Sequence, residues 1–185
     1  MIKAKKSLGQ NFLIDKSVIE KICNSGNITK NNNILEIGPG TGNLTEFILQ
    51  KKPKKIYVIE KDERLVNLLS ERFKNQITII NEDILKISEH SISNDELIVF
   101  GNLPYNISTQ ILSKWIISAY NKKWYKSLIL MFQKEVANRI LAKTNSKNYG
   151  RLTILSNWKL DVEKIIDISA YCFSPKPKVE SSLLK

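Results

Sequence analysis

The chain has 185 residues, 42% of them hydrophobic, which is enough for one well-buried core and too few for two comfortable domains. Lysine and arginine total 29 against 18 aspartate and glutamate residues, so the formal charge is +11 and nucleic acid is the leading class of partner. Lysine-rich usage spread over every face would give the same charge, so charge alone does not decide the partner. No apolar run approaches the ~18 residues of a membrane span and no secretory segment is present, so we expect a cytoplasmic, soluble protein.

Histidine and cysteine, two common metal ligands, are scarce. Cys23 and Cys172 lack CxxC spacing and lie among apolar residues, which is typical of reduced thiols. The one histidine, His90, lies in a polar stretch and is expected at the surface. We therefore expect neither a histidine-based metal site nor serine–histidine catalysis.

Short apolar runs alternate with segments of helical period along most of the chain. After a basic arm, the pattern predicts helices over 15–23, 41–51, 62–73, 108–120, 134–142 and 151–158, with Asp15 and Asp62 as helix caps. It predicts strands over 33–37, 55–60, 76–81, 97–101 and 127–132, and two closing strands over 162–168 and 179–184. Such alternation is typical of an α/β fold in which helices cover both faces of a mostly parallel sheet.

The first chemical motif is a glycine-rich turn, EIGPGTG at 36–42, directly after the first predicted strand of the sheet. Missing side chains there would let a nucleotide-like cofactor touch the backbone. The spacing differs from the GxGxxG of dinucleotide enzymes, and no Lys-Ser or Lys-Thr pair follows as in a phosphate-binding loop. A nucleoside cofactor without a triphosphate fits best.

Acidic residues close the next two predicted strands. Glu60 follows the second strand, where a carboxylate would accept from both hydroxyls of a ribose. Asp83 ends the third strand and could accept from the exocyclic amine of adenine, with Ile84 as an apolar wall for the ring. Either carboxylate alone is more often a helix cap or an ion-pair partner, but their positions at successive strand ends favour a nucleoside site.

The most informative motif is Asn102-Leu103-Pro104-Tyr105, which directly follows the apolar run at 97–101. It places an amide, a stiff turn and an aromatic ring at the carboxyl end of a buried strand, where open α/β sheets bind ligands. An amide oxygen accepts hydrogen bonds and an aromatic ring stacks on another flat ring, so the motif suits an aromatic amine such as adenine.

Together these residues resemble the S-adenosylmethionine-dependent rRNA adenine N6,N6-dimethyltransferases, especially the small-subunit KsgA/RsmA type. The resemblance covers nearly the whole chain. It rests on GQNFL at 9–13, the glycine turn, Glu60, Asp83, NLPYNIS at 102–108 and FSPKPKV at 173–179. It implies a Rossmann-like class I methyltransferase fold with a seven-stranded sheet whose last strand is antiparallel. It also implies that residues 1–185 form the catalytic domain, with a basic arm over 1–14, and lack the family's C-terminal helical domain.

For the cofactor, S-adenosyl-L-methionine, the resemblance implies contacts along the glycine turn and the strand ends. Asn11 and the backbone of Leu13 would contact the methionine end, and Gly38 and Gly40 would pass beneath it. Glu60 would hold the ribose and Asp83, beside Ile84, the adenine, while Asn102 would lie between cofactor and substrate. Without the resemblance, Asn11 would be read as part of a turn leading into the first helix.

For the reaction, the Asn102 side-chain oxygen and the Leu103 carbonyl are expected to accept from the adenine amine, with Pro104 aiming that carbonyl. Tyr105 would stack on the flipped base and Phe173 would cover its other face, although Phe173 could equally be a core residue. The basic arm residues Lys3, Lys5 and Lys6, with Lys176 and Lys178, could contact phosphates. No metal and no general base are required.

The expected product is N6,N6-dimethyladenine in rRNA of a small ribosomal subunit precursor, made by a monomer. Three alternatives stay open at this point. One is a macrolide-resistance-type methyltransferase that acts on large-subunit rRNA. The others are an NAD-dependent oxidoreductase, which the glycine spacing argues against, and a non-catalytic RNA-binding or assembly factor with the same fold.

Overall fold

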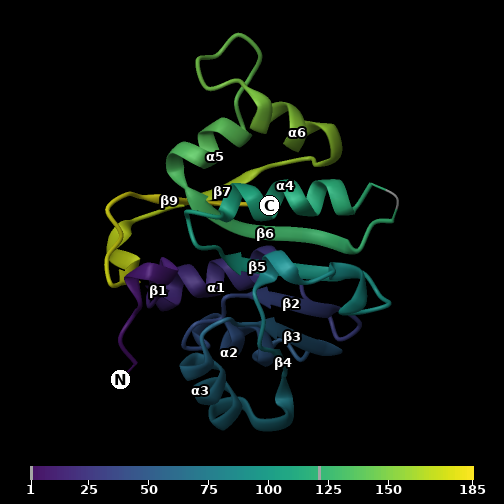
Figure 1. Ribbon diagram of the computed structural model, residues 1–185, viewed down its shortest axis with the longest axis vertical. Coiled ribbons are helices and arrows are strands. Elements are labelled where there is room, and N and C mark those ends of the chain that lie inside the picture. The colour runs from purple at the N-terminus through teal and green to yellow at the C-terminus, as the bar shows by residue number, and fades with distance from the viewer. Residues whose placement is uncertain (1, 121) are drawn as a thin grey trace.

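A sheet of seven strands organises the computed structural model, which describes residues 2–120 and 122–185 (Figure 1). The strand order is β4-β3-β2-β5-β6-β9-β7, and the first five strands in this order run parallel to one another. Strand β9 lies between β6 and β7 and is antiparallel to both. The sheet strands are β2 (Asn33–Ile37), β3 (Lys55–Ile59), β4 (Thr78–Ile80), β5 (Leu97–Asn102), β6 (Tyr125–Gln133), β7 (Lys164–Ile168) and β9 (Ser181–Leu184). The expected class I methyltransferase topology is confirmed.

Six α-helices of the described residues accompany the sheet: α1 (Lys16–Ser25), α2 (Asn43–Gln50), α3 (Glu63–Phe73), α4 (Ser108–Ser118), α5 (Lys134–Ile140) and α6 (Arg151–Lys159). Asp15 caps α1 by accepting from the backbone N–H groups of Ser17 and Val18 at 2.9 and 3.0 Å. Asp62 caps α3 in the same way through Arg64, at 3.2 Å. Both caps expected from the sequence are confirmed.

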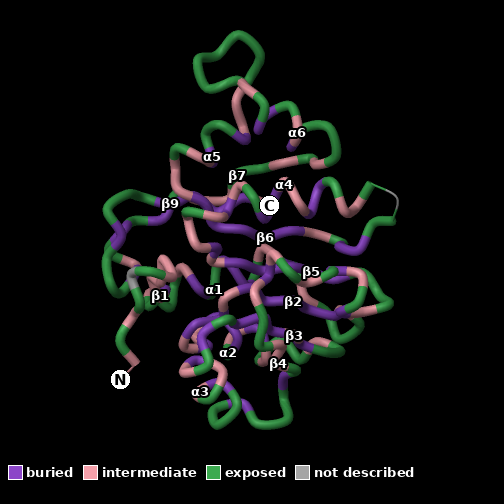
Figure 2. The backbone as a smooth tube through the Cα atoms, in the orientation of Figure 1, coloured by how far each residue is buried: buried purple, intermediate pink, exposed green. Residues whose placement is uncertain are grey.

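Helices cover both faces of the sheet because alternate residues of a strand point to opposite faces. In β5, Val99 packs into a core with Trp115 of α4, while Phe100 packs into a second core with Ile19 of α1. The central strands are therefore buried from both sides, as Figure 2 shows by their colour. This double burial explains why β2 reads ILEI as a nearly continuous apolar run in the sequence.

Several element ends differ from the sequence expectation. The predicted strand over 179–184 begins only at Ser181, because Val179 is 43% exposed and Glu180 instead forms an ion pair with Lys134 at 2.7 Å. The strand predicted over 76–81 is shortened to 78–80 because a 3-10 helix, η2 (Lys74–Gln76), precedes it.

His90 is half-buried rather than exposed. It lies in a short 3-10 helix, η4 (Glu89–Ser91), and its Nε2 lies 3.2 Å from the carbonyl oxygen of Ser118. The packing of η4 against the end of α4, which is remote in sequence, explains the difference. Within the described residues, no helix has both the length and the apolar character that crossing a membrane requires.

Candidate active site

A cavity of about 240 Å³ lies at the carboxyl ends of β2, β3, β4 and β5. Its lining combines residues 7–13 of the N-terminal arm with residues that follow each of these strands. All but one of the site residues expected from the sequence line it: Asn11, Leu13, Gly38, Gly40, Glu60, Asp83, Ile84, Asn102, Leu103, Pro104 and Tyr105. The structure thus brings together residues that are remote from one another in the chain.

The glycine turn passes directly beneath the arm. Gly40 has a φ of 58°, and a Cβ on this residue would lie 2.9 Å from Cδ1 of Phe12, which also lines the cavity. Any other residue would meet both the strained backbone conformation and this overlap. The backbone of the turn is therefore brought to the cavity surface without side chains in between.

The carboxylate of Glu60 is held in place by the chain that follows it. Its Oε1 accepts a hydrogen bond from the backbone N–H of Asp62 at 2.9 Å, and its backbone carbonyl accepts one from Nδ2 of Asn81 at 2.9 Å. The residue is 7% exposed, and this burial raises the pKa of Glu60. Its carboxyl group in the cavity lining is suited to hydroxyl donors.

Asp83 faces the cavity as an ionised acceptor. Its Oδ2 pairs with Lys61 Nζ at 2.8 Å, and its Oδ1 accepts from the backbone N–H of Leu85 at 3.0 Å. The bond to Lys61 is the main cause that lowers the pKa of Asp83. The adjacent Ile84 is 6% exposed and adds an apolar surface to the lining.

Glu36 also lines the cavity, although sequence analysis assigned no role to it. It is 3% exposed, and its Oε2 accepts a hydrogen bond from Thr45 Oγ1 at 2.6 Å. Burial raises the pKa of Glu36 to about 7, and the nearby carboxylate of Glu60 acts in the same direction. Its position between two apolar residues in a buried strand was the available signal, since a lone carboxylate there requires a partner.

The amide of Asn102 is fixed in orientation by the arm. Its Nδ2 donates a hydrogen bond to the backbone oxygen of Asn11 at 2.8 Å. With the nitrogen engaged in this way, the oxygen of the amide is the group left to accept a hydrogen bond from a ligand. The Asn11 side chain itself donates back to the carbonyl of Gly9 at 3.2 Å, and so does not form the turn into the first helix that the alternative interpretation expected.

Residues after Asn102 form a tight connection into α4. Ile107 N–H donates to the Pro104 carbonyl at 3.1 Å, and Leu103 is 1% exposed. Tyr105 is half-buried, and its hydroxyl shares a hydrogen bond with Ser181 Oγ at 2.6 Å. The ring of Tyr105 is therefore anchored at its far end while it contributes to the cavity lining.

Phe173 is the site residue that the structure does not bring into the lining. It is 3% exposed, it pairs with Leu13 in a two-stranded sheet of β1 (Phe12–Leu13) and β8 (Phe173–Ser174), and it packs in the same core as Ile19. This placement agrees with the alternative interpretation of Phe173 as a core residue. The backbone carbonyl of Leu13 is likewise engaged, since it accepts from Asn43 Nδ2 at 2.8 Å.

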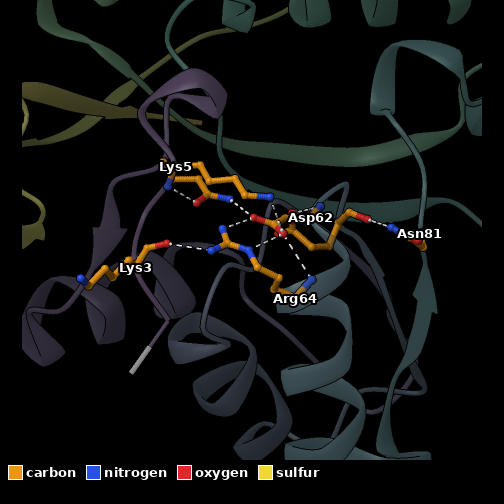
Figure 3. Close-up of polar contacts among 7 residues, drawn as sticks. Lys3, Lys5, Asp62, Arg64 and Asn81 are labelled. Carbon is orange, nitrogen blue, oxygen red and sulfur yellow. Dashed lines mark hydrogen bonds and ion pairs between the residues drawn. The ribbon is translucent and has the colours of Figure 1, made fainter.

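The basic arm contacts the start of α3 through Asp62, as Figure 3 shows. Lys5 Nζ lies 3.4 Å from Asp62 Oδ1, and the carbonyl of Lys3 accepts from Arg64 at 3.3 Å. Lys5 is therefore already paired in this structure, whereas the sequence suggested that it contacts phosphates. Lys176, which the sequence also suggested as a phosphate contact, has its Nζ 3.4 Å from the ring centroid of Tyr171.

Within the described residues, no group of three or more histidine, cysteine, aspartate and glutamate side chains is arranged to hold a metal ion. His90 lies outside the cavity lining.

Comparison with known proteins gives a consistent result. The family model described as "Ribosomal RNA adenine dimethylase" matches residues 1–185. A relative named "Ribosomal RNA small subunit methyltransferase A" from Pelagibacter ubique (strain HTCC1062) is 63% identical over 183 residues, which are 99% of this chain and 70% of that protein.

Solved structures show the same fold. A dimethyladenosine transferase from Plasmodium falciparum has a TM-score of 0.84 and 32% identity, over 94% of this chain and 62% of that chain. The 23S rRNA methyltransferase ErmE has a TM-score of 0.77 and 27% identity, over 94% of this chain and 68% of that chain. The present chain thus spans about two thirds of the length of these proteins. It belongs to the ribosomal RNA adenine dimethylase family.

Proposed function

We propose that this chain transfers methyl groups from S-adenosyl-L-methionine to the N6 amine of adenines in small-subunit rRNA, giving N6,N6-dimethyladenine. The observation that carries the proposal is the fixed amide of Asn102 beside a cavity whose other polar groups suit a nucleoside. Family membership and the name of the 63% identical relative support the reaction and the small subunit.

The cavity residues fit S-adenosyl-L-methionine. Gly40 leaves no side chain between the turn and the cavity, and the lining beyond it supplies two carboxylates, Glu60 and Asp83, with an apolar surface at Ile84. Glu60 would accept from the ribose hydroxyls and Asp83 from the adenine amine, while Gly38 and the arm residues Asn11 and Leu13 would border the methionine end.

When bound, the cofactor supplies a methyl group on a sulfonium, which needs only an aligned nucleophile about 3 Å away. The protein must therefore improve the nucleophile. The exocyclic nitrogen of adenine is nearly planar because its lone pair is shared with the ring. Acceptors on both of its hydrogens favour the pyramidal form in which that lone pair is available.

We assign these acceptors to the side-chain oxygen of Asn102 and the backbone carbonyl of Leu103. Pro104 restricts Leu103 to extended geometry and so directs the carbonyl. Tyr105 would stack on the base, a contact worth about 1–3 kcal/mol that helps offset its removal from the RNA. After transfer the nitrogen carries a positive charge and loses a proton readily, so no dedicated base is needed.

We further infer that the substrate is rRNA within a small-subunit precursor, that the protein acts as a monomer and that it is cytoplasmic. The formal charge of +11 supports an RNA partner. The alternative substrate, large-subunit rRNA, is supported by the fold of ErmE, but at 27% identity rather than 63%.

The proposal is tested by labelled methyl transfer to undermethylated small subunits and, in parallel, to large subunits, followed by nucleoside analysis. We expect dimethyladenosine in the small subunit only. Asn102→Ala should lower the transfer rate on the order of 10²–10³-fold, as for the loss of one aligned polar group, while RNA binding persists. Asn157→Ala, at an exposed position of α6, is the matched control. An unchanged rate in Asn102→Ala would refute the assigned role.

A further inference from the structure

The first part of the N-terminal arm, up to residue 10, contacts one buried carboxylate, that of Asp62. Its side chain is 1% exposed, although it accepts from two residues of the arm. Gln10 Nε2 donates to Oδ2 at 3.1 Å, and Lys5 Nζ lies 3.4 Å from Oδ1 (Figure 3). From α3, Arg64 donates to the same carboxylate through Nε at 3.0 Å and through its terminal nitrogen at 2.6 Å.

The two arm residues that contact Asp62, Lys5 and Gln10, lie at the two ends of a turn. The backbone N–H of Lys5 donates to Gln10 Oε1 at 2.7 Å, and the backbone N–H of Leu8 donates to the Lys5 carbonyl at 3.1 Å. Residues 5–10 are thus folded on themselves, and Asp62 binds both ends of this unit. The residues that follow, up to 13, line the cofactor cavity and include the carbonyl that orients Asn102.

Asp62 also contacts a residue of the cavity lining that lies outside the arm. Its backbone N–H donates to Oε1 of Glu60 at 2.9 Å. Asp62 itself is absent from the cavity lining. Its effect on a ligand would therefore pass through neighbouring residues, and the arm and Glu60 are the ones among its partners that line the cavity.

The geometry points to Asp62 as the positioning residue that fixes the N-terminal arm over the cofactor cavity and aligns Glu60 with it. Bonds between ionised groups are stronger than those between neutral ones, so this carboxylate is suited to restrain residues 5–10 against the start of α3. The Arg64 guanidinium holds the pKa of Asp62 well below its usual range, so the carboxylate stays ionised. The inference rests on the proposed function only in naming the cofactor.

A pair of substitutions tests the contact between Asp62 and Gln10. Gln10→Glu keeps the oxygen that accepts from Lys5 but loses the N–H donor and places a second carboxylate 3.1 Å from the first. Asp62→Asn keeps an oxygen that can cap α3 but weakens the bonds to the arm. In the double variant the amide introduced at position 62 can donate to the carboxylate introduced at position 10, which restores the contact with the arm. The bond from the Arg64 terminal nitrogen to the same atom of residue 62 is lost in Asp62→Asn and in the double variant alike, so recovery is measured against Asp62→Asn.

The measurements are the Kd of S-adenosylhomocysteine, the stable product of the cofactor, and the rate of tryptic cleavage within the arm. We expect Gln10→Glu and Asp62→Asn each to raise the Kd about 10-fold and to speed cleavage, and the double variant to recover most of both changes. Asp15→Asn, which alters the cap of α1 without touching the arm's contact with Asp62, is the matched control.

Unchanged cleavage and Kd in Gln10→Glu would overturn the inference even if Asp62→Asn failed to fold. Absence of recovery in a folded double variant would also overturn it. The proposed function fails separately: a chain that binds S-adenosylhomocysteine with this dependence on Asp62 but transfers no methyl group to small subunits would disprove the function and leave the inference standing.

Discussion

The buried carboxyl group of Glu36 makes stability depend on pH in a way that one substitution should remove. In the unfolded chain a glutamate releases its proton near pH 4.5, whereas burial raises the pKa of Glu36 to about 7 in the folded protein. Between these values the folded state binds a proton that the unfolded state has lost. Stability should therefore fall as the pH rises from 4.5 to 7 and level off above it.

The size of this effect follows from the interval between the two pKa values, 4.5 and about 7. Each pKa unit corresponds to about 1.4 kcal/mol, so ionised Glu36 lowers the free energy of unfolding by about 3 kcal/mol above pH 7. Glu36→Gln cannot ionise, and its side-chain oxygen can still accept from Thr45. The amide group of the introduced glutamine gains no hydrogen-bond acceptor, and burying an unpaired donor costs about 1 kcal/mol. The net gain at pH 8 is about 2 kcal/mol.

The assay is urea denaturation of both proteins at pH 5, 6, 7 and 8, with Glu20→Gln at an exposed position of α1 as the control. We expect Glu36→Gln to be no more stable than the original protein at pH 5 and more stable at pH 8. Parallel pH profiles for the two proteins would refute the reasoning, because they would mean that Glu36 is ionised in the folded state throughout.

Two further predictions concern the glycine turn and Phe173. Gly42→Ala should lower the free energy of unfolding by about 3 kcal/mol, because Gly42 has a φ of 83° and its Cβ would lie 2.4 Å from Phe73. Gly150→Ala, with nothing within 4 Å, is the control in the same thermal unfolding series, and equal effects would contradict the prediction. Phe173→Leu should lower the free energy of unfolding by about 1 kcal/mol and leave methyl transfer unchanged, because the ring is buried in the core and lies outside the cavity lining. A loss of transfer of about 10-fold in the folded variant would contradict this prediction.

The order and type of the elements could be predicted because each depends on local pattern. Strand β2 reads as an apolar run, and Asp15 and Asp62 precede helical periods as capping residues do. The cavity could be anticipated for a related reason: the turn after β2 and the ends of β3 and β5 must meet at one edge of a parallel sheet.

Contacts between remote segments could not be predicted from local pattern. The bond from Gln10 to Asp62 spans 52 residues, and the local sequence around either residue does not indicate the other as its partner. Phe173 illustrates the same limit: its pairing with Leu13 in a two-stranded sheet depends on how two remote segments meet. The burial of His90 likewise depends on its packing near Ser118.

The place of β9 in the sheet has a consequence for how the domain is assembled during translation. Strands β2 to β6 can pair once residue 133 has emerged from the ribosome, since all their mutual partners precede that point. Among the strands that the structure describes, β7 pairs with β9 alone, and β9 ends at Leu184. Before β9 is available, the edge of β6 that pairs with β9 is unpaired, and β7 lacks the strand that joins it to the sheet. A ribosome that stalls within this interval would expose an unpaired strand edge, which is the kind of surface that recruits chaperones or aggregates.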